Sequence, residues 1–243
     1  MLRVREADLE VIAIKMIQQN PAQIFKSELR RQFESNGHSC FSTLNFGSYF
    51  EESRKPFGVL HFFNEEILVP QHATKTVLEA NTAILILPLF GGVDYKDSFG
   101  NESFIGVEQI RIISAEKEMS FKLSNSYEEE NVSYLQIGFN AKIQDFESNF
   151  KQFDFGLTDK NQLIPLFEIS NALGFIGMYD GRKEGVYSLK NSSNGVFVFV
   201  INGAFEVENR LLESKDGLSL SGIDSLEWEA LSENALLIVL EIP

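Results

Sequence analysis

The sequence predicts an all-β protein built from two tandem antiparallel β-barrels of the jelly-roll type, with only a few short helices. Apolar or alternating runs are separated by Gly, Asn, Asp and Ser at intervals of roughly 8–12 residues, a spacing typical of sandwiches and barrels. The chain also contains an internal repeat. It has 22 Phe in 243 residues, which supply large apolar side chains without a polar tip for a dry interior.

Strand signals dominate from residue 40 onward. The clearest runs are Ala83–Phe90, Gln109–Ile113, Ser133–Phe139, Gly195–Ile201 and Ala235–Ile242. Helical patterns are short. Pro21–Leu29 predicts one helix with proline at its first position, where the missing N–H costs nothing. A second helix is predicted around Ile143–Phe150.

The repeat relates the two halves of the chain. Ala83–Phe90 leads into Gly91-Gly92 and a strand at 93–96, and Val196–Ile201 leads to Gly203 and a strand at 205–208. Each copy then has a further strand, an alternating strand and a closing apolar strand. These are 109–114, 119–125 and 134–139 in the first copy, and 217–221, 226–232 and 236–242 in the second. A period of roughly 110 residues is too long for a solenoid, so we infer a duplicated barrel rather than chance similarity of turns.

This repeat divides the chain into four parts. Residues 1–20 lie outside it and are expected to form an extension or an edge strand. Residues 21–142 form the first barrel, 143–162 are a polar connector, and 163–243 form the second barrel.

Composition excludes several classes of function. The chain has 21 basic and 35 acidic residues, a net charge of −14, so it would repel a phosphate backbone and is not expected to bind nucleic acid directly. No apolar run approaches the ~20 residues that cross a bilayer. The run 11–14 is too short for a secretory signal, so we expect a cytoplasmic protein. Cys40 is the only cysteine, which excludes an internal disulfide.

An ordered series of short motifs resembles the pirin family, duplicated cupins that include bacterial quercetinase-like proteins. The series is Ser42–Phe50, Phe57-Gly58, Asn64-Glu65-Glu66 with Pro70, Asp97–Asn101, Ile113–Ala115 and Leu135–Ile137. The resemblance covers roughly residues 21–243. It implies two cupin barrels packed face to face, and it suggests the family's link to transcription cofactors.

The resemblance also locates a metal site, and there this chain departs from the family. Members that hold iron use a His-x-His and a His-x-Glu element, and a count without gaps places these at Val77 and Glu79, and at Phe121 and Leu123. Ligands kept without their dication would be unpaired polar groups costing ~1–3 kcal/mol each, whereas Val, Phe and Leu fill the space with apolar atoms. We therefore expect no metal and no cofactor, and we treat these four residues as positions of a degenerate ligand pocket.

Glu79 is the one potential oxygen donor left. Among apolar neighbours its carboxyl would have a raised pKa and could act as a general base or acid without a metal. The simpler alternative is that it reaches solvent or pairs with a lysine. His72 could approach it through a register slip or a rearranged loop, but two ligands rarely bind a metal tightly. His38 and Cys40 share one strand face at i and i+2, although a half-buried, unreactive cysteine is the simpler interpretation.

The leading functional hypothesis is a non-catalytic binding or regulatory bicupin, with a protein partner or a small apolar or aromatic ligand, and with no membrane or nucleic-acid partner. The alternative is an enzyme. It would be a quercetin 2,3-dioxygenase-like protein with an unusual metal site, or a metal-free cupin that uses the cavity around Glu79. A third hypothesis is a structural role in which exposed sheets form an oligomer. Fold alone does not decide among these.

Overall fold

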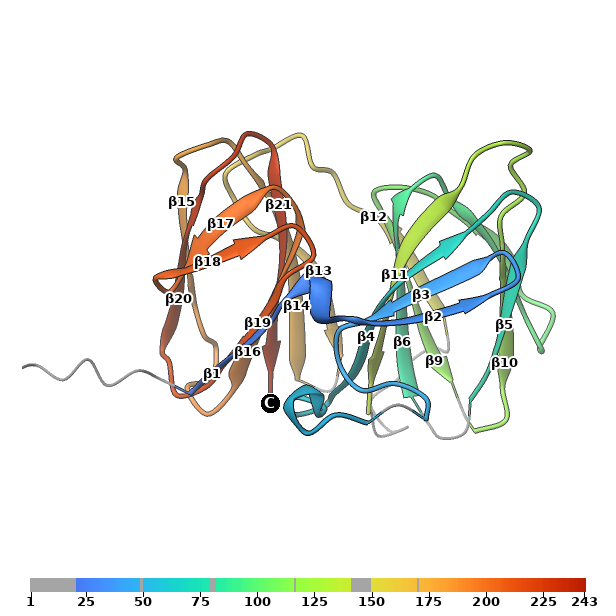
Figure 1. Ribbon diagram of the computed structural model, residues 1–243, viewed down its shortest axis with the longest axis horizontal. Helices are drawn as coiled ribbons and strands as arrows, with labels where there is room; N and C mark the ends of the chain where they lie inside the picture. Colours follow the sequence, from blue (N-terminus) through green and yellow to red (C-terminus); the bar gives the residue numbers. More distant parts are fainter. Residues whose placement is uncertain (1–20, 49, 79–81, 116, 141–149, 170) are drawn as a thin grey trace, which may run out of the picture.

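The computed structural model describes residues 21–48, 50–78, 82–115, 117–140, 150–169 and 171–243. Two β-barrels lie side by side along the long axis of the molecule (Figure 1). Within these ranges the only helices are two short 3-10 segments, η1 (Ser27–Leu29) and η2 (Glu52–Arg54). The predicted all-β fold is confirmed. No helix in the described part of the chain is long and apolar enough to cross a membrane.

The first barrel consists of a large and a small antiparallel sheet. The large sheet has the order β12 (Phe150–Asp154), β9 (Gln109–Ala115), β6 (Thr82–Phe90), β11 (Val132–Phe139), β4 (Leu60–Leu68), β3 (His38–Ser42) and β2 (Arg31–Ser35). The small sheet has the order β5 (Ala73–Val77), β10 (Ser120–Ser124), β7 (Val93–Asp97) and β8 (Glu102–Ile105).

The second barrel repeats this plan. Its large sheet has the order β1 (Ala22–Phe25), β19 (Gly217–Leu220), β16 (Gly195–Asn202), β21 (Ala235–Ile242), β14 (Ala172–Tyr179) and β13 (Ile164–Ile169). Its small sheet has the order β15 (Glu184–Ser188), β20 (Ser225–Ala230), β17 (Ala204–Val207) and β18 (Arg210–Glu213). Each half therefore pairs one large sheet with one four-stranded sheet, which agrees with the duplicated barrel inferred from the internal repeat.

The burial patterns explain the two kinds of strand in the sequence. The large sheets are covered on both faces, so β6 reads as a continuous apolar run. On this strand Ile84 and Ile86 face the interior of the first barrel, and Leu85 and Leu87 face the second barrel. The small sheets are covered on one face only, so β10 and β20 alternate between buried and exposed residues.

Phenylalanine dominates the shared core between the barrels. The ring centroid of Phe63 on β4 lies 5.3 Å from that of Phe197 and 4.5 Å from that of Phe199, both on β16. Phe139 packs edge to face on Phe167 at 5.4 Å. The unusual Phe content thus fills the junction of two large sheets as well as the barrel interiors.

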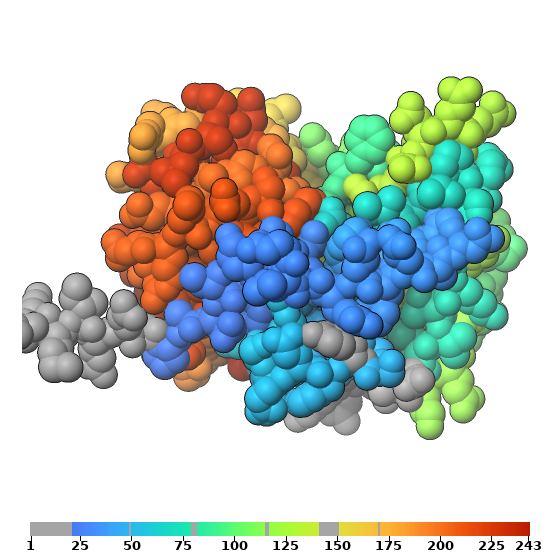
Figure 2. All heavy atoms as spheres, viewed as in Figure 1, coloured from blue at the N-terminus to red at the C-terminus, as the bar shows by residue number. Residues whose placement is uncertain are grey.

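The N-terminal segment crosses between the barrels, which differs from the predicted division. Residues 22–25 form strand β1, which pairs with β19 of the second barrel, and only η1 is helical, so the helix predicted over Pro21–Leu29 is wrong. Pairing with an open sheet edge overrides the local helical signal. Figure 2 shows this blue segment against both barrels. The first 20 residues lie outside the described part of the chain.

The predicted connector also contributes a strand. Phe150–Asp154 forms β12, which pairs with β9 and extends the large sheet of the first barrel. The helix predicted around 143–150 falls mainly on residues 141–149, which lie outside the described residues. Strand β1 therefore joins the second barrel, whereas β12 comes from the predicted connector and joins the first.

Candidate functional site

Two of the four predicted pocket residues lie together inside the first barrel. Phe121 and Leu123 are neighbours at i and i+2 on β10, and their side chains are 1% and 0% exposed. Both belong to the core that β10 forms with the large sheet. Their neighbour Lys122 is exposed, as the period of two in a strand requires.

The third residue, Val77, does not join them. Strand β5 pairs Val77 with Ser120, and its side chain is 59% exposed. The expectation that Val77 fills the former site is wrong, because the count without gaps ignores the register of the sheet. Thr76 is paired with Phe121 and Thr74 with Leu123, so these threonines occupy the inner face of β5. Glu79 lies outside the described residues.

A ring stack extends from Phe121 into the barrel. The Tyr95 ring lies 5.9 Å from that of Phe121 at an interplanar angle of 23°, and the Cζ atom of Arg111 lies 3.9 Å from the Tyr95 centroid. Tyr95 donates its hydroxyl hydrogen bond to Asp97 at 3.1 Å. Burial, together with the Asp97 carboxylate, raises the pKa of Tyr95. A neutral phenol thus contacts the Arg111 guanidinium.

Arg111 is a buried cation, 6% exposed. It donates hydrogen bonds to Ser103 Oγ at 2.7 Å and to Gln152 Oε1 at 3.0 Å. The inner side of the first barrel therefore carries a fixed positive charge that neither the composition nor the motifs predict. Arg111 lies between Ile110 and Ile112 on β9, and it is the cross-strand partner of Ile86 on β6.

A second polar group lies on β3, β4 and β11. Glu66 is paired with Cys40 on one side and with Tyr134 on the other. Its Oε2 atom lies 2.5 Å from His38 Nε2. Burial and the Glu66 charge raise the pKa of the Cys40 thiol, so the cysteine stays protonated and is a poor nucleophile. The predicted shared face of His38 and Cys40 is confirmed, and Glu66, which the motif series contains without a role, is the residue that contacts both.

The other two histidines have local partners. The Nδ1 atom of His72 lies 2.8 Å from the Pro70 carbonyl oxygen, and its ring packs on Gly37, where a Cβ atom would lie 2.0 Å from it. His61 is exposed on β4 and its ring is 6.1 Å from that of Phe62.

The donor set can be compared with what a metal requires. Catalytic sites of this kind need three or more nitrogen or oxygen ligands around one point. Phe121 and Leu123 carry no such atom, and Val77 carries none and faces outward. Among the described residues no three His, Cys, Asp or Glu side chains converge as a metal-binding group. The described residues at the predicted positions therefore do not fit the family's metal.

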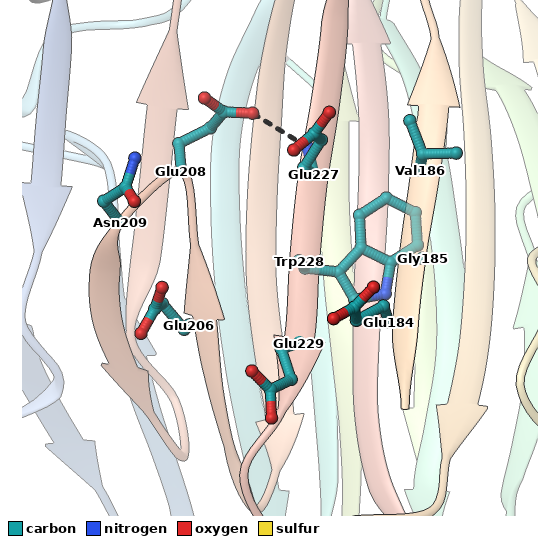
Figure 3. Close-up of a pocket in the computed structure, with 9 residues that line it drawn as sticks. All are labelled: Glu184, Gly185, Val186, Glu206, Glu208, Asn209, Glu227, Trp228 and Glu229. Atoms are coloured by element: carbon teal, nitrogen blue, oxygen red, sulfur yellow. Dashed lines mark hydrogen bonds between the residues drawn. The ribbon is translucent and has the colours of Figure 1, made fainter. Parts of the chain in front are cut away.

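The described residues form open hollows on the outside of the barrels, and three of these are lined by charged side chains. The first, about 520 Å³, covers the small sheet of the second barrel and is lined mainly by glutamates (Figure 3). The second, about 390 Å³, is at the mouth of that barrel beside Glu241 and Lys190. The third, about 410 Å³, lies on the small sheet of the first barrel beside Lys96 and Lys122.

Glu241 is an anion held entirely by neutral donors. It is 0% exposed, and it accepts hydrogen bonds from the Tyr187 hydroxyl at 2.5 Å and from Asn194 Nδ2 at 2.8 Å. The backbone N–H groups of Lys190 and Asn191 donate to it at 2.9 and 3.0 Å. Burial would raise the pKa of Glu241, but these donors lower it below its ordinary value. Two donors on each oxygen saturate the carboxylate, so its role is to fix the loop between β15 and β16.

Comparisons with known proteins agree with this architecture. Residues 171–242 match the model of the quercetinase C-terminal cupin domain. A putative quercetin 2,3-dioxygenase from Pasteurella multocida, PM1685, is 23% identical over 82% of this chain and 89% of its own length.

Solved structures show the same fold over nearly the whole chain. YhhW from Escherichia coli superposes with a TM-score of 0.81 at 16% identity, covering 92% of this chain and 98% of its own. The same bacterial pirin in complex with nickel(II) gives 0.78 at 17% identity, covering 92% and 99%. A quercetin 2,3-dioxygenase from Acinetobacter baumannii gives 0.70 at 14% identity, covering 91% and 79%. The chain therefore has the two-barrel fold of these proteins, and its residues 171–242 resemble the quercetinase C-terminal cupin domain.

Proposed function

We propose that this bicupin is a non-catalytic binding or regulatory protein whose first barrel no longer holds the family's metal. The observation that carries the proposal is the inner face of β10. There Phe121 and Leu123, both fully buried, occupy the positions where the resemblance implies a histidine and a glutamate.

The surroundings of these two residues support the proposal. The Phe121 ring stacks on Tyr95, and the Tyr95 ring in turn contacts the Arg111 guanidinium. Phe121 and Leu123 offer a dication no donor atom, and the stacked rings occupy the space beside them. Apolar side chains and the Arg111 guanidinium therefore fill the region where the resemblance implies a metal centre.

We infer that binding takes place on the outside of the barrels. The three hollows are all open, and each is lined by charged side chains. This favours a protein partner over the small apolar or aromatic ligand that the sequence also allows. We also propose a cytoplasmic location, supported by a fold whose single thiol, Cys40, is buried and unpaired.

The competing function is that of a quercetin 2,3-dioxygenase. The names of PM1685 and of the Acinetobacter baumannii structure favour it. It requires donor atoms from outside the described residues, Glu79 among them, to assemble a site beside Phe121. A metal-free reaction at Glu79 is the second form of this alternative.

The test is metal content and turnover, measured side by side with PM1685. Both proteins are purified without a tag, incubated anaerobically with Fe(II) or Ni(II), desalted and analysed by plasma mass spectrometry. We expect less than about a tenth of an equivalent in this protein and no oxygen uptake with quercetin. Near-stoichiometric metal with quercetin-dependent oxygen uptake would overturn the proposal. Turnover without metal that disappears in Glu79→Gln would establish the metal-free enzyme instead.

A further inference from the structure

The small sheets of the two barrels carry rows of like charge on their outer faces. On β5, β10 and β7, Lys122 is the cross-strand partner of both Lys75 and Lys96. On β15, β20 and β17, Glu229 is the cross-strand partner of both Glu184 and Glu206. We call these the lysine row and the glutamate row. The two sheets lie at opposite ends of the long axis of the molecule (Figure 1).

Both rows point to solvent. All three lysines are exposed, as are Glu184 and Glu206, whereas Glu229 is half-buried. In Figure 3 the carboxylates of the glutamate row project from one face of the sheet beside the first hollow. Lys96 and Lys122 line the corresponding hollow of the first barrel.

Like charges directly opposite each other on neighbouring strands destabilise a sheet. The chain relieves this only in part. Lys96 pairs with Glu102, and Arg182 lies 3.2 Å from Glu229 Oε1. Within the described part of the chain, no ion pair involves the other two residues of either row. Charges of the opposite sign on a partner molecule would reduce the repulsion within each row.

The two rows are similar in geometry and opposite in charge. Neighbouring strands lie ~4.8 Å apart, so three consecutive strands space the charges of each row equally. Exposed apolar side chains flank both rows. These are Val186 and Leu211 beside the glutamates, 64% and 57% exposed, and Val77 and Phe104 beside the lysines, 59% and 50% exposed.

We propose that copies of this protein associate head to tail, with the glutamate row of one copy on the lysine row of the next. The two surfaces differ, so the contact is heterologous and builds chains rather than a closed two-fold dimer. The net charge of −14 opposes association, so we expect a weak, reversible contact. Exposed charge pairs of this kind are sensitive to salt.

Sedimentation velocity over a concentration series tests the proposal. The apparent association constant of the wild type should fall about tenfold or more between ~0.05 and ~0.5 M salt. Reversing the charge of either row should by itself abolish association. The two variants are Lys75→Glu/Lys122→Glu and Glu184→Lys/Glu206→Lys. Mixed one to one, the two variants should associate again, because one then carries acidic rows at both ends and the other basic rows.

The matched control is Lys55→Glu/Lys151→Glu, which makes the same change in net charge at exposed lysines outside the two rows. It should associate as the wild type does. A wild type that stays monomeric throughout overturns the proposal. So does association that survives either row reversal, or variants that do not recover on mixing. Far-UV circular dichroism verifies that each variant is folded. Metal and turnover play no part in these measurements, so their outcome is separate from that of the proposed function.

Discussion

Lys215 Nζ lies 2.7 Å from Glu65 Oε1, and this contact joins the two barrels. The second oxygen of Glu65 lies 2.8 Å from Arg30 NH1, on the segment that crosses between them. The Arg30 and Glu65 side chains are 8% and 10% exposed. One carboxylate therefore holds together a turn of the second barrel, a strand of the first and the N-terminal crossing segment.

Glu65→Gln should destabilise the protein by about 3 kcal/mol, because the nearly buried Arg30 and the partly buried Lys215, 8% and 25% exposed, lose their shared counter-charge. Chemical unfolding in urea measures the loss. The matched control is Glu129→Gln, an exposed residue in the turn before β11, which should change the free energy of unfolding by less than about 0.5 kcal/mol. Equal effects in the two variants would contradict a role for Glu65 in joining the barrels.

Acid should weaken the fold through its buried carboxylates. Burial would raise the pKa of Glu65, but Lys215 and Arg30 lower it below the ordinary value of 4.5. Its stabilisation is thus complete above that value and is lost as the pH falls through the lower pKa of the folded state. Urea midpoints measured between about pH 7 and about pH 3.5 should decline, and the decline should be shallower in Glu65→Gln. Identical pH profiles would contradict the prediction.

Glu241→Gln should cost about 2 kcal/mol, because an amide presents a donor to groups that are themselves donors. Four hydrogen bonds converge on this carboxylate from the loop around Asn191 and from Tyr187. Glu168→Gln is the control, since Glu168 lines the same hollow but is exposed. Hydrogen exchange of the Lys190 and Asn191 amides should accelerate in Glu241→Gln only. Unchanged protection there would show that the carboxylate does not fix the loop.

The two barrels should unfold together. They share the phenylalanine core and are joined by β1 and by Glu65. Leu123→Ala, inside the first barrel, should cost about 2–5 kcal/mol. The fluorescence of Trp228, which lies inside the second barrel, should report the full loss. Val77→Ala, on the exposed face of β5, is the control and should be near neutral. Two separate transitions, with Trp228 insensitive to Leu123→Ala, would contradict cooperative unfolding.

The register of β5 and β10 predicts where a metal site can be restored. Four ligands can be placed on facing inner positions of these strands, whose paired Cβ atoms are ~4.5–5.5 Å apart. The variant combines Thr74→His, Thr76→His, Phe121→His and Leu123→Glu. This variant should bind about one equivalent of Ni(II), measured by calorimetry and reversed by a chelator. The control replaces Val77 instead of Thr76, which turns one imidazole outward, and it should bind at least about tenfold more weakly. Equal affinities would show that the inner-face assignment is wrong.

The sequence determined the architecture because its signals are local and repeated. A strand covered on one face alternates between apolar and polar residues, as 119–125 and 226–232 do. A strand covered on both faces is a continuous apolar run, as 83–90 and 236–242 are. The family resemblance placed Phe121 and Leu123 at the former metal site, and in the structure both side chains lie inside the barrel, 1% and 0% exposed. The internal repeat predicted two similar barrels, and in the structure each half has one large and one small sheet.

The tertiary structure alone decided the pairings between distant segments. Local propensity favoured a helix at 21–29, whereas an open edge on β19 made residues 22–25 a strand. A one-residue difference in register moves a side chain to the opposite face of a sheet, which is why counting along the sequence misplaced Val77. Arg111 on Tyr95, Lys215 on Glu65 and the two rows of like charge arise from residues far apart in the chain. Sheet register brings together the charges of each row, whereas packing between sheets and between barrels brings Arg111 to Tyr95 and Lys215 to Glu65.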